Sequence, residues 1–283
     1  MIASQQNPTL DIPLIRIRPS SERLANGLKE LWHFRELLYF LVWRDVKVRY
    51  KQTAIGAAWA IIQPVLTMLI FTLVFDKFAK MPSDGLPYPI FSFAALLPWT
   101  YFSKALNQSV SSVVADANLI TKVYFPRLLL PLSAVVGGLI DFAIAFVFLL
   151  GMMAWYGLAL QWAILLLPIF VVLTMLTALS VGVWLSVINV RYRDVGQAIP
   201  FLVQIWLFAS PVAYSISVVP DKWRFLYYLN PLAGIIEGFR WALLGNQNPP
   251  IIVLVSTTAM VLALLYGGIV FFKRMEKTFA DVV

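Results

Sequence analysis

Six long runs of apolar residues constrain this chain more than any other feature of its sequence. A helix needs roughly 20 mostly apolar residues to cross the hydrocarbon core of a lipid bilayer. The runs lie at Ile55–Phe78, Tyr88–Val113, Pro131–Tyr156, Trp162–Ile188, Ala198–Ile216 and Ile251–Phe272. Their lengths predict an all-α membrane protein with six transmembrane helices.

The composition supports lipid as the solvent around these runs. Of the 283 residues, 60% are hydrophobic and 13% are charged, whereas soluble domains carry about 25% charged residues. The second run is the most polar, because its inner half contains Ser103, Lys104, Asn107 and Gln108. Cysteine is absent, which excludes disulfides and thiolate metal sites.

Basic residues indicate which ends of the spans face the cytoplasm. If the N-terminus is inside, the inner segments carry 16 Lys and Arg residues, the outer segments carry five, and one lies within a span. An excess of this kind is typical of cytoplasmic loops. The sequence therefore predicts that both termini are cytoplasmic. The net charge of +8 then reflects topology and contact with lipid headgroups, and no nucleic-acid partner is expected.

The residues ahead of the first run divide into two parts. Residues 1–20 contain three prolines and little apolar periodicity, which predicts a flexible N-terminal arm. Residues 21–53 predict an amphipathic helix in the membrane interface, followed by a basic run, and residues 54–283 predict the six-helix transmembrane domain. The cations of the basic run that we expect near headgroup phosphates are Arg44, Lys47, Arg49 and Lys51. Fixing the topology of the first span explains this run equally well.

The segment at about 218–250 is too long for a plain turn and too polar for a full span. It is rich in aromatic residues and is divided by Asn230-Pro231, where a helix can begin. Glu237 and Arg240 are then one turn apart and can pair. We expect a re-entrant helical pair that enters the outer leaflet and returns before the last span.

The sequence lacks the residues of a nucleotide site or a catalytic centre. It contains no Gly-x-x-x-x-Gly-Lys phosphate loop and no Gly-x-Ser-x-Gly elbow. The one histidine, His33, lies on the interfacial helix and is better interpreted as a headgroup contact than as a ligand or base. Asp141 is the isolated acid of the third run, with only Lys104 at a matching depth. Such an acid can serve ion coupling or lock helices together, and we favour the second role.

Aromatic and amide side chains recur within two of the runs. Those that we predict to line a pore are Trp59, Gln63 and Phe71 on the first run and Gln204, Trp206 and Phe208 on the fifth. Aromatic faces with scattered amides suit a sugar chain, because a pyranose presents C–H faces to stack and hydroxyls to hydrogen-bond. Each of these residues, taken singly, also fits ordinary helix packing.

Several short motifs follow one another along the chain. In order, they are Trp43-Arg44-Asp45, Val48-Arg49-Tyr50-Lys51-Gln52-Thr53, Gly56-Ala57-Ala58-Trp59, Leu97-Pro98-Trp99, Asn118–Arg127, Asn189–Val195 and Leu229-Asn230-Pro231. Their order and spacing resemble the ABC-2 type permeases that export polysaccharides, including O-antigen, capsular and teichoic acid polymers. The likeness extends from about residue 30 to the C-terminus.

The resemblance implies a homodimeric permease joined to two copies of a cytoplasmic ABC ATPase. ATP and magnesium would bind to the ATPase, so this chain would bind no cofactor or metal and would not itself be an enzyme. The residues that the motifs imply for coupling to the ATPase are Asn118, Lys122, Phe125, Arg127, Arg191, Tyr192, Arg193 and Asp194. The substrate would be an O-antigen-like polysaccharide on a polyprenyl diphosphate, moved outward across the bacterial inner membrane. The basic run at residues 44–51 would then contact the lipid diphosphate.

Other functions remain open at this point. Within the same family, the cargo could be a teichoic acid, a glycolipid or a drug. An ion-coupled secondary transporter is a different class, which would depend on Asp141. A membrane-embedded glycan enzyme would need acids on a single face, and the outer acids Asp84, Asp221 and Glu237 are scattered along the sequence.

Overall fold

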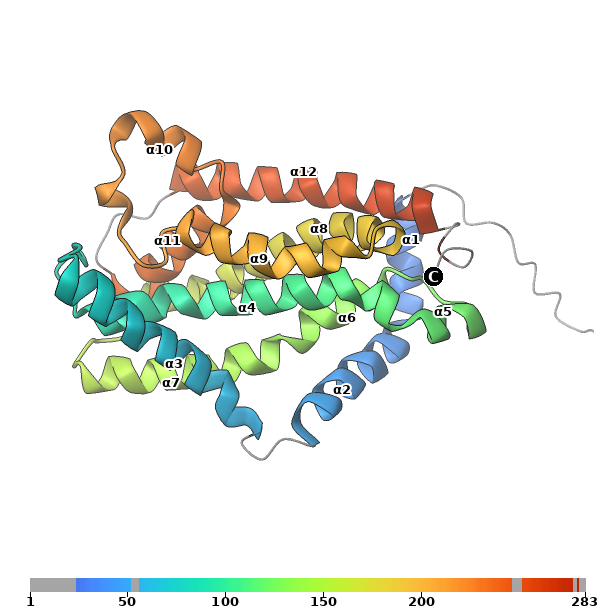
Figure 1. The fold of residues 1–283 in the computed structure, drawn as a ribbon, viewed down its shortest axis with the longest axis horizontal. Coiled ribbons are helices and arrows are strands. Elements are labelled where there is room, and N and C mark those ends of the chain that lie inside the picture. The colour runs from blue at the N-terminus through green and yellow to red at the C-terminus, as the bar shows by residue number, and fades with distance from the viewer. Residues whose placement is uncertain (1–23, 52–55, 246–250, 277–278, 280–283) are drawn as a thin grey trace, which may run out of the picture.

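The computed structural model describes residues 24–51, 56–245, 251–276 and 279, and these residues form helices and no strands. The α-helices are α1 (Leu24–His33), α2 (Arg35–Lys51), α3 (Trp59–Phe71), α4 (Tyr88–Ala115), α5 (Ala117–Lys122), α6 (Leu129–Gly137), α7 (Leu139–Trp155), α8 (Leu167–Arg191), α9 (Asp194–Phe208), α10 (Asp221–Tyr227), α11 (Pro231–Leu244) and α12 (Ile251–Glu276). The long helices run side by side, while α1, α5 and the last described residues lie at one end of the bundle and α10 lies at the other (Figure 1). The predicted arm, residues 1–20, lies outside the described residues.

Four helical segments within the described ranges are long and apolar enough to cross a membrane: Gly56–Phe78, Leu129–Trp155, Trp162–Arg191 and Val253–Glu276. The prediction of an all-α membrane protein is therefore confirmed. The remaining two predicted spans differ from these four, because α4 is polar in its inner half and α9 has only 15 residues. The bundle thus contains four clearly apolar spans, and the count of six stays a prediction.

Helix α4 lies at the centre of the bundle, which explains how its polar half is accommodated. Most of its side chains are buried, and it packs on α6, α8 and α11. A Cβ atom at Gly182 of α8 would lie 2.3 Å from Ser109 Oγ of α4. Small residues therefore permit the close approach of these two backbones, as in many membrane helix pairs.

The third predicted span is broken into two helices. Helix α6 ends at Gly137 and α7 begins at Leu139. The Tyr101 hydroxyl donates a hydrogen bond to the Val135 carbonyl (2.9 Å), and a Cβ at Gly138 would lie only 3.0 Å from the Tyr101 ring. The break therefore brings the start of α7, including Asp141, against α4.

The fifth predicted span ends earlier than expected. Helix α9 stops at Phe208 instead of continuing to about Ile216. Pro211 has no backbone N–H and disfavours a helical conformation of the residue before it, which explains the stop. The Asn230 amide donates to the Ala209 carbonyl (3.3 Å) and to Ser210 Oγ (2.8 Å), which ties the end of α9 to the start of α11.

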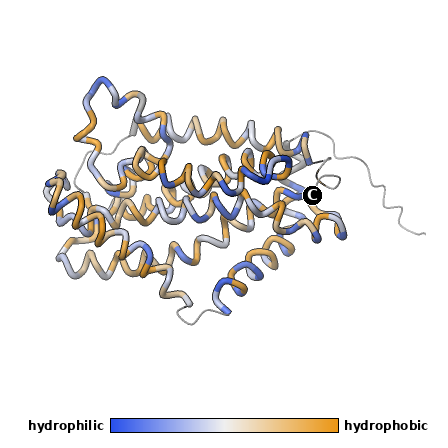
Figure 2. The backbone as a smooth tube through the Cα atoms, in the orientation of Figure 1, coloured by the Kyte–Doolittle hydropathy of each residue, from blue (hydrophilic) through white to orange (hydrophobic). Residues whose placement is uncertain are grey.

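The predicted interfacial helix is two helices, α1 and α2, which meet at Phe34. Helix α2 packs on α6 and runs obliquely to the bundle, and its C-terminal end lies at the lower edge of the view, part-way along the length of the bundle (Figure 1). Figure 2 shows that hydrophilic residues are concentrated in α2 and around α10, whereas the long helices are mainly hydrophobic. The basic run therefore lies along the side of the bundle instead of across its end.

Candidate functional site

Two exposed segments lie together at the end of the bundle that carries α1. One is α5, where Asn118 and Lys122 are exposed, and the other is the turn that joins α8 to α9 (Figure 1). The side chains of this turn are exposed at all four predicted coupling positions, Arg191, Tyr192, Arg193 and Asp194. The two segments offer a partner a surface that combines both charges.

A buried asparagine holds the second of these segments in place. Asn189 Nδ2 donates to the Val110 carbonyl of α4 (3.1 Å), and its Oδ1 accepts from the Gly196 N–H (2.8 Å). A Cβ at Gly196 would lie 2.9 Å from that Oδ1, so a larger residue there would displace the Asn189 side chain. The role of Asn189 could not be predicted from the sequence, because its partners on α4 and α9 are recognisable only once the helices are packed.

Two predicted coupling residues have structural roles inside the subunit. The Phe125 side chain is 3% exposed. The Arg127 N–H donates to Glu276 Oε1 (2.9 Å), its guanidinium donates to the Glu276 carbonyl, and it lies 5.9 Å from the centre of the Phe279 ring. These contacts fix the segment after α5 to the end of α12. Phe125 is thus buried and Arg127 half-buried within the subunit, and their predicted role in coupling stays a prediction.

The basic run divides into paired and unpaired cations. Arg44 makes a two-pronged contact with Asp116, at 2.7 and 2.8 Å, and also bonds Asp45. The hydrogen bond to Asp116 raises the pKa of Arg44 above its usual value. Because Asp116 immediately precedes α5, this contact ties α2 to the exposed α5. Lys47 and Lys51 are exposed and remain available for headgroups, whereas Arg44 is committed within the chain.

Asp141 has more partners than the sequence indicated. Its carboxylate accepts a hydrogen bond from the Tyr50 hydroxyl, and its Oδ2 lies 3.1 Å from Arg49 Nη1 and 3.6 Å from Lys104 Nζ. Arg49 Nη2 also donates to Gln108 Oε1 (2.9 Å). We refer to Arg49, Tyr50, Lys104, Gln108 and Asp141 as the Asp141 cluster. It joins α2, α4 and α7, which agrees with the predicted locking role and corrects the expectation that Asp141 has little company.

The Asp141 cluster lies away from both ends of the bundle, because Asp141 is in the first turn of α7, directly after the break between α6 and α7. At 1.5 Å per residue, Asp141 is about 18 Å from Leu129, where α6 begins, and about 21 Å from Trp155, where α7 ends. A small cavity of about 10 Å³ adjoins Lys104 and Asp141, with Pro64 and Thr100 among its lining residues. That volume is at the lower limit for one water molecule. The cluster is therefore close-packed and far from either end of the bundle.

Of the six predicted pore-lining residues, four are exposed, one is buried and one, Trp206, is half-buried. Trp59, Gln63, Gln204 and Phe208 are exposed on the outer faces of α3 and α9. Phe71 is 6% exposed and packs edge-to-face on Phe75 inside the subunit, so its side chain is not available to line a pore as predicted.

Trp206 is half-buried beside an open aromatic hollow. Its Nε1–H donates to Asn230 Oδ1 (3.0 Å), which fixes the indole ring. Trp206, Trp223, Tyr227 and Asn230 line a hollow of about 310 Å³. Trp223 and Tyr227 come from α10, which the sequence placed only within a broad re-entrant segment.

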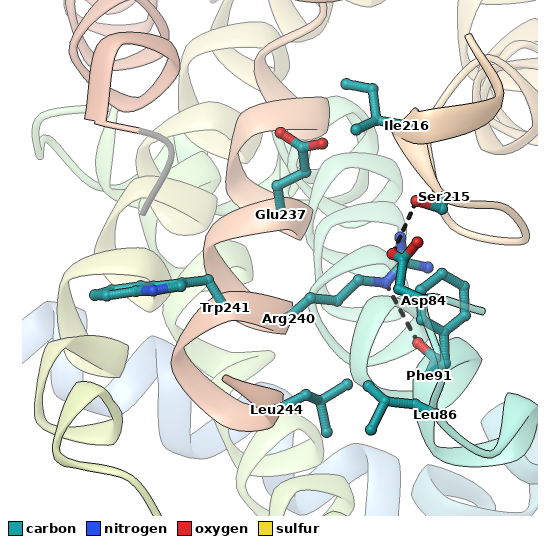
Figure 3. A pocket seen from close by; sticks show the side chains of 9 residues that line it. All are labelled: Asp84, Leu86, Phe91, Ser215, Ile216, Glu237, Arg240, Trp241 and Leu244. Atoms are coloured by element: carbon teal, nitrogen blue, oxygen red, sulfur yellow. Dashed lines mark hydrogen bonds between the residues drawn. The ribbon is translucent and has the colours of Figure 1, made fainter. Parts of the chain in front are cut away.

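The outer end of the bundle contains a second, smaller pocket (Figure 3). Arg240 donates to the carbonyls of Phe91 (3.4 Å), Val212 (2.9 Å) and Tyr214 (3.2 Å). Arg240 points across the pocket towards the loop after α9 and Asp84, whereas Glu237, with which a pair was predicted, points away from it (Figure 3). The cavity of about 20 Å³ has room for one water.

Metal binding has no support from the described part of the chain, in which no three His, Asp or Glu residues come together in a way that could hold an ion.

Comparison with known proteins gives consistent matches along most of the chain. Residues 36–244 match the family described as ABC-2 type transporter. The chain is 30% identical over 258 residues to the O-antigen export system permease protein RfbA of Myxococcus xanthus, which covers 90% of this chain and 98% of that protein. It is 28% identical to a protein of the same name from Klebsiella pneumoniae, over 89% of this chain and 97% of that one. Identity to the polysialic acid transport protein KpsM of Escherichia coli is 22%, over 83% and 91% of the two chains.

Proposed function

The chain belongs to the ABC-2 type transporter family, and from this premise we propose that it is the membrane-spanning subunit of an ATP-driven polysaccharide exporter. Relatives named for O-antigen and polysialic acid transport match nearly the full chain. Within the family, these relatives favour a polysaccharide over a drug. The cargo is an O-antigen-like polymer carried on a polyprenyl diphosphate and moved outward across the bacterial inner membrane.

The observation that carries the choice of cargo is the aromatic hollow at the end of α9. Two indole rings and a phenol ring border about 310 Å³ of open space, and the Trp206 ring is held by Asn230. Rigid aromatic faces offer stacking area at a low cost in conformational entropy. A sugar ring fits this chemistry, since its C–H face can stack while its hydroxyls remain in water.

Two copies of the chain enclose the pathway in this proposal. Gln63 on α3 and Gln204 on α9 are exposed on otherwise apolar faces. An amide without a hydrogen-bond partner is costly in hydrocarbon. A second subunit that covers these faces would remove the amides from lipid and place them beside a wet path, together with Trp59 and Phe208.

Energy is supplied by a separate ABC ATPase in this account. The sequence has no phosphate-binding loop, so ATP and magnesium bind to the partner, and this chain is not an enzyme. The contacts with the ATPase are assigned to the exposed residues of α5 and of the turn at residues 191–194. Helix α1 and the end of α12 share that end of the bundle (Figure 1), which supports a cytoplasmic location for both termini.

Ion coupling is the competing class of function. It requires an intramembrane carboxylate that can exchange a proton or cation during transport. Asp141 is instead held by two cations and a tyrosine hydroxyl. The geometry therefore favours the ATP-driven function.

The direct test is deletion of the gene in its own host, followed by glycan analysis and purification of the tagged chain. We expect loss of the surface polysaccharide, accumulation of the lipid-linked polymer inside, and co-purification of an ABC ATPase. The wild-type chain supplied from a plasmid should restore the surface polysaccharide. It should fail to do so when the ATPase of the complex is a variant that binds ATP but cannot hydrolyse it. Normal surface glycan in the deletion strain would contradict it.

A further inference from the structure

The Asp141 cluster contains more cations than anions. Arg49 and Lys104 both approach the same carboxylate oxygen, Asp141 Oδ2, at 3.1 and 3.6 Å. The other two members, Tyr50 and Gln108, carry no charge. Asp45 on α2 and Asp116 after α4 are both bonded to Arg44. One carboxylate therefore serves two cations.

The hydrogen-bonding capacity of these cations is not exhausted. Arg49 Nη1 is buried and has no hydrogen-bond partner in spite of its closeness to Asp141. The side chains of Arg49 and Lys104 retain 23% and 29% of their exposed area, compared with 13% for Asp141. The side chains of both cations are thus partly exposed, and more so than the carboxylate that pairs with them.

The depth of the cluster makes this surplus costly. Lys104 is about 17 Å along α4 from its inner end at Ala115 and about 24 Å from Tyr88. A cation in the middle of a membrane is expensive and is normally associated with a ligand or a transport path. Helix α2 also carries the exposed Lys47 and Lys51 along the oblique course seen in Figure 1. Positive charges therefore extend from the inner end of the bundle towards the cluster.

We propose that the Asp141 cluster is a transient binding site for the diphosphate group of a lipid-linked cargo. This inference rests on the proposed export function and adds a second anion position, beyond the exposed lysines of α2. Arg49 offers a planar fork and Lys104 a flexible point charge, and both suit phosphate oxygens. Asp141 competes with the diphosphate for the two cations. It pairs with them when no cargo is present, and these ion pairs re-form when the diphosphate leaves.

This arrangement predicts that substitutions of Lys104 and Asp141 change the half-saturating concentration of the lipid in opposite directions. The complex with its ATPase is reconstituted in phosphatidylethanolamine vesicles that contain graded amounts of undecaprenyl diphosphate, and stimulated ATP hydrolysis is measured. Lys104→Gln should raise the half-saturating lipid concentration by about tenfold, since a charge-assisted contact is lost. Asp141→Asn should lower that concentration, because the competitor is removed, and should reduce the maximal rate, because release is slower.

Matched variants separate this effect from damage to the fold. Lys104→Arg keeps the charge and should keep the half-saturating concentration near that of the wild type. Lys77→Gln removes an exposed lysine outside the cluster, and it should change neither the half-saturating concentration nor the maximal rate. If Asp141 and Lys104 only lock helices together, both substitutions would lower thermal stability and leave the half-saturating concentration unchanged, which would overturn the proposal.

The source of the anion is tested in the same vesicles. Soluble inorganic pyrophosphate should compete weakly, because it shares the diphosphate chemistry but is not concentrated in the membrane. Phosphatidylglycerol should not replace undecaprenyl diphosphate, and equal stimulation by both lipids would overturn the assignment to a diphosphate. A wild-type complex that exports no polymer would refute the proposed function itself. If the wild-type complex exports polymer but substitutions of Lys104 and Asp141 leave the half-saturating concentration unchanged, only this inference is refuted.

Discussion

Replacement of Arg240 by methionine should destabilise the outer end of the bundle. The guanidinium of Arg240 donates to three backbone carbonyls, those of Phe91, Val212 and Tyr214. It also lies 3.7 Å from the centre of the Phe91 ring. One side chain therefore joins α11 to the start of α4 and to the loop that follows α9.

The size of the effect follows from what methionine leaves behind. Each buried carbonyl that loses its partner costs roughly 1–3 kcal/mol, and the longest of the three bonds, 3.4 Å to Phe91, contributes least. Loss of the cation–π contact adds about 0.5–2 kcal/mol. Relief from burying a charge offsets part of this sum. We expect a net loss of about 3 kcal/mol in the free energy of unfolding.

The purified chain is unfolded in graded mixtures of mild detergent and dodecyl sulfate, and tryptophan fluorescence monitors the unfolding. Arg224→Met is the matched control, because Arg224 is partly exposed and forms its ion pair with the exposed Asp221 three residues away. Its effect should stay below about 0.5 kcal/mol. If Arg240→Met and Arg224→Met unfold at the same point, the reasoning about the three carbonyls is refuted.

Three further predictions concern coupling, packing and cargo. Charge reversal at both Lys122 and Arg193 should abolish co-purification of the ATPase while the chain remains folded, and normal recovery of the complex would count against the assigned surface. Gly182→Ala should cost about 1–3 kcal/mol of stability by overpacking, and Ser109→Gly should recover most of that loss because it removes the colliding side chain; no recovery would contradict the contact seen between α4 and α8. Trp59→Ala should reduce surface polysaccharide at unchanged levels of protein, and undiminished surface glycan would remove this residue from the pathway.

The membrane class and the four apolar spans were predictable because hydrophobic length is a local property of the sequence. The first span, predicted at Ile55–Phe78, is Gly56–Phe78 in the structure. The break at Gly138 was missed because it depends on Tyr101, which is distant in sequence and meets the helix only after packing. The early end of α9 had a local signal in Pro211, which the hydrophobic run concealed.

The candidate sites were predictable as segments but not as contacts. The motifs identified the exposed residues of α5 and of the turn after α8, but not that Arg127 would be bonded to Glu276, 149 residues away. Arg49 was assigned to headgroups because α2 was expected to lie in the interface. Its oblique course brings Arg49 to Asp141 instead, and no periodicity within α2 could indicate that direction.

Polymer transport in sealed vesicles tests the central claim most directly. The chain and its ATPase would be reconstituted together, with lipid-linked polysaccharide supplied on the ATPase side and its arrival in the lumen measured by protection from an added glycosidase. We predict protected polymer only when both proteins, ATP and magnesium are present. Accumulation driven by an ion gradient without ATP, or by the chain alone, would contradict the account.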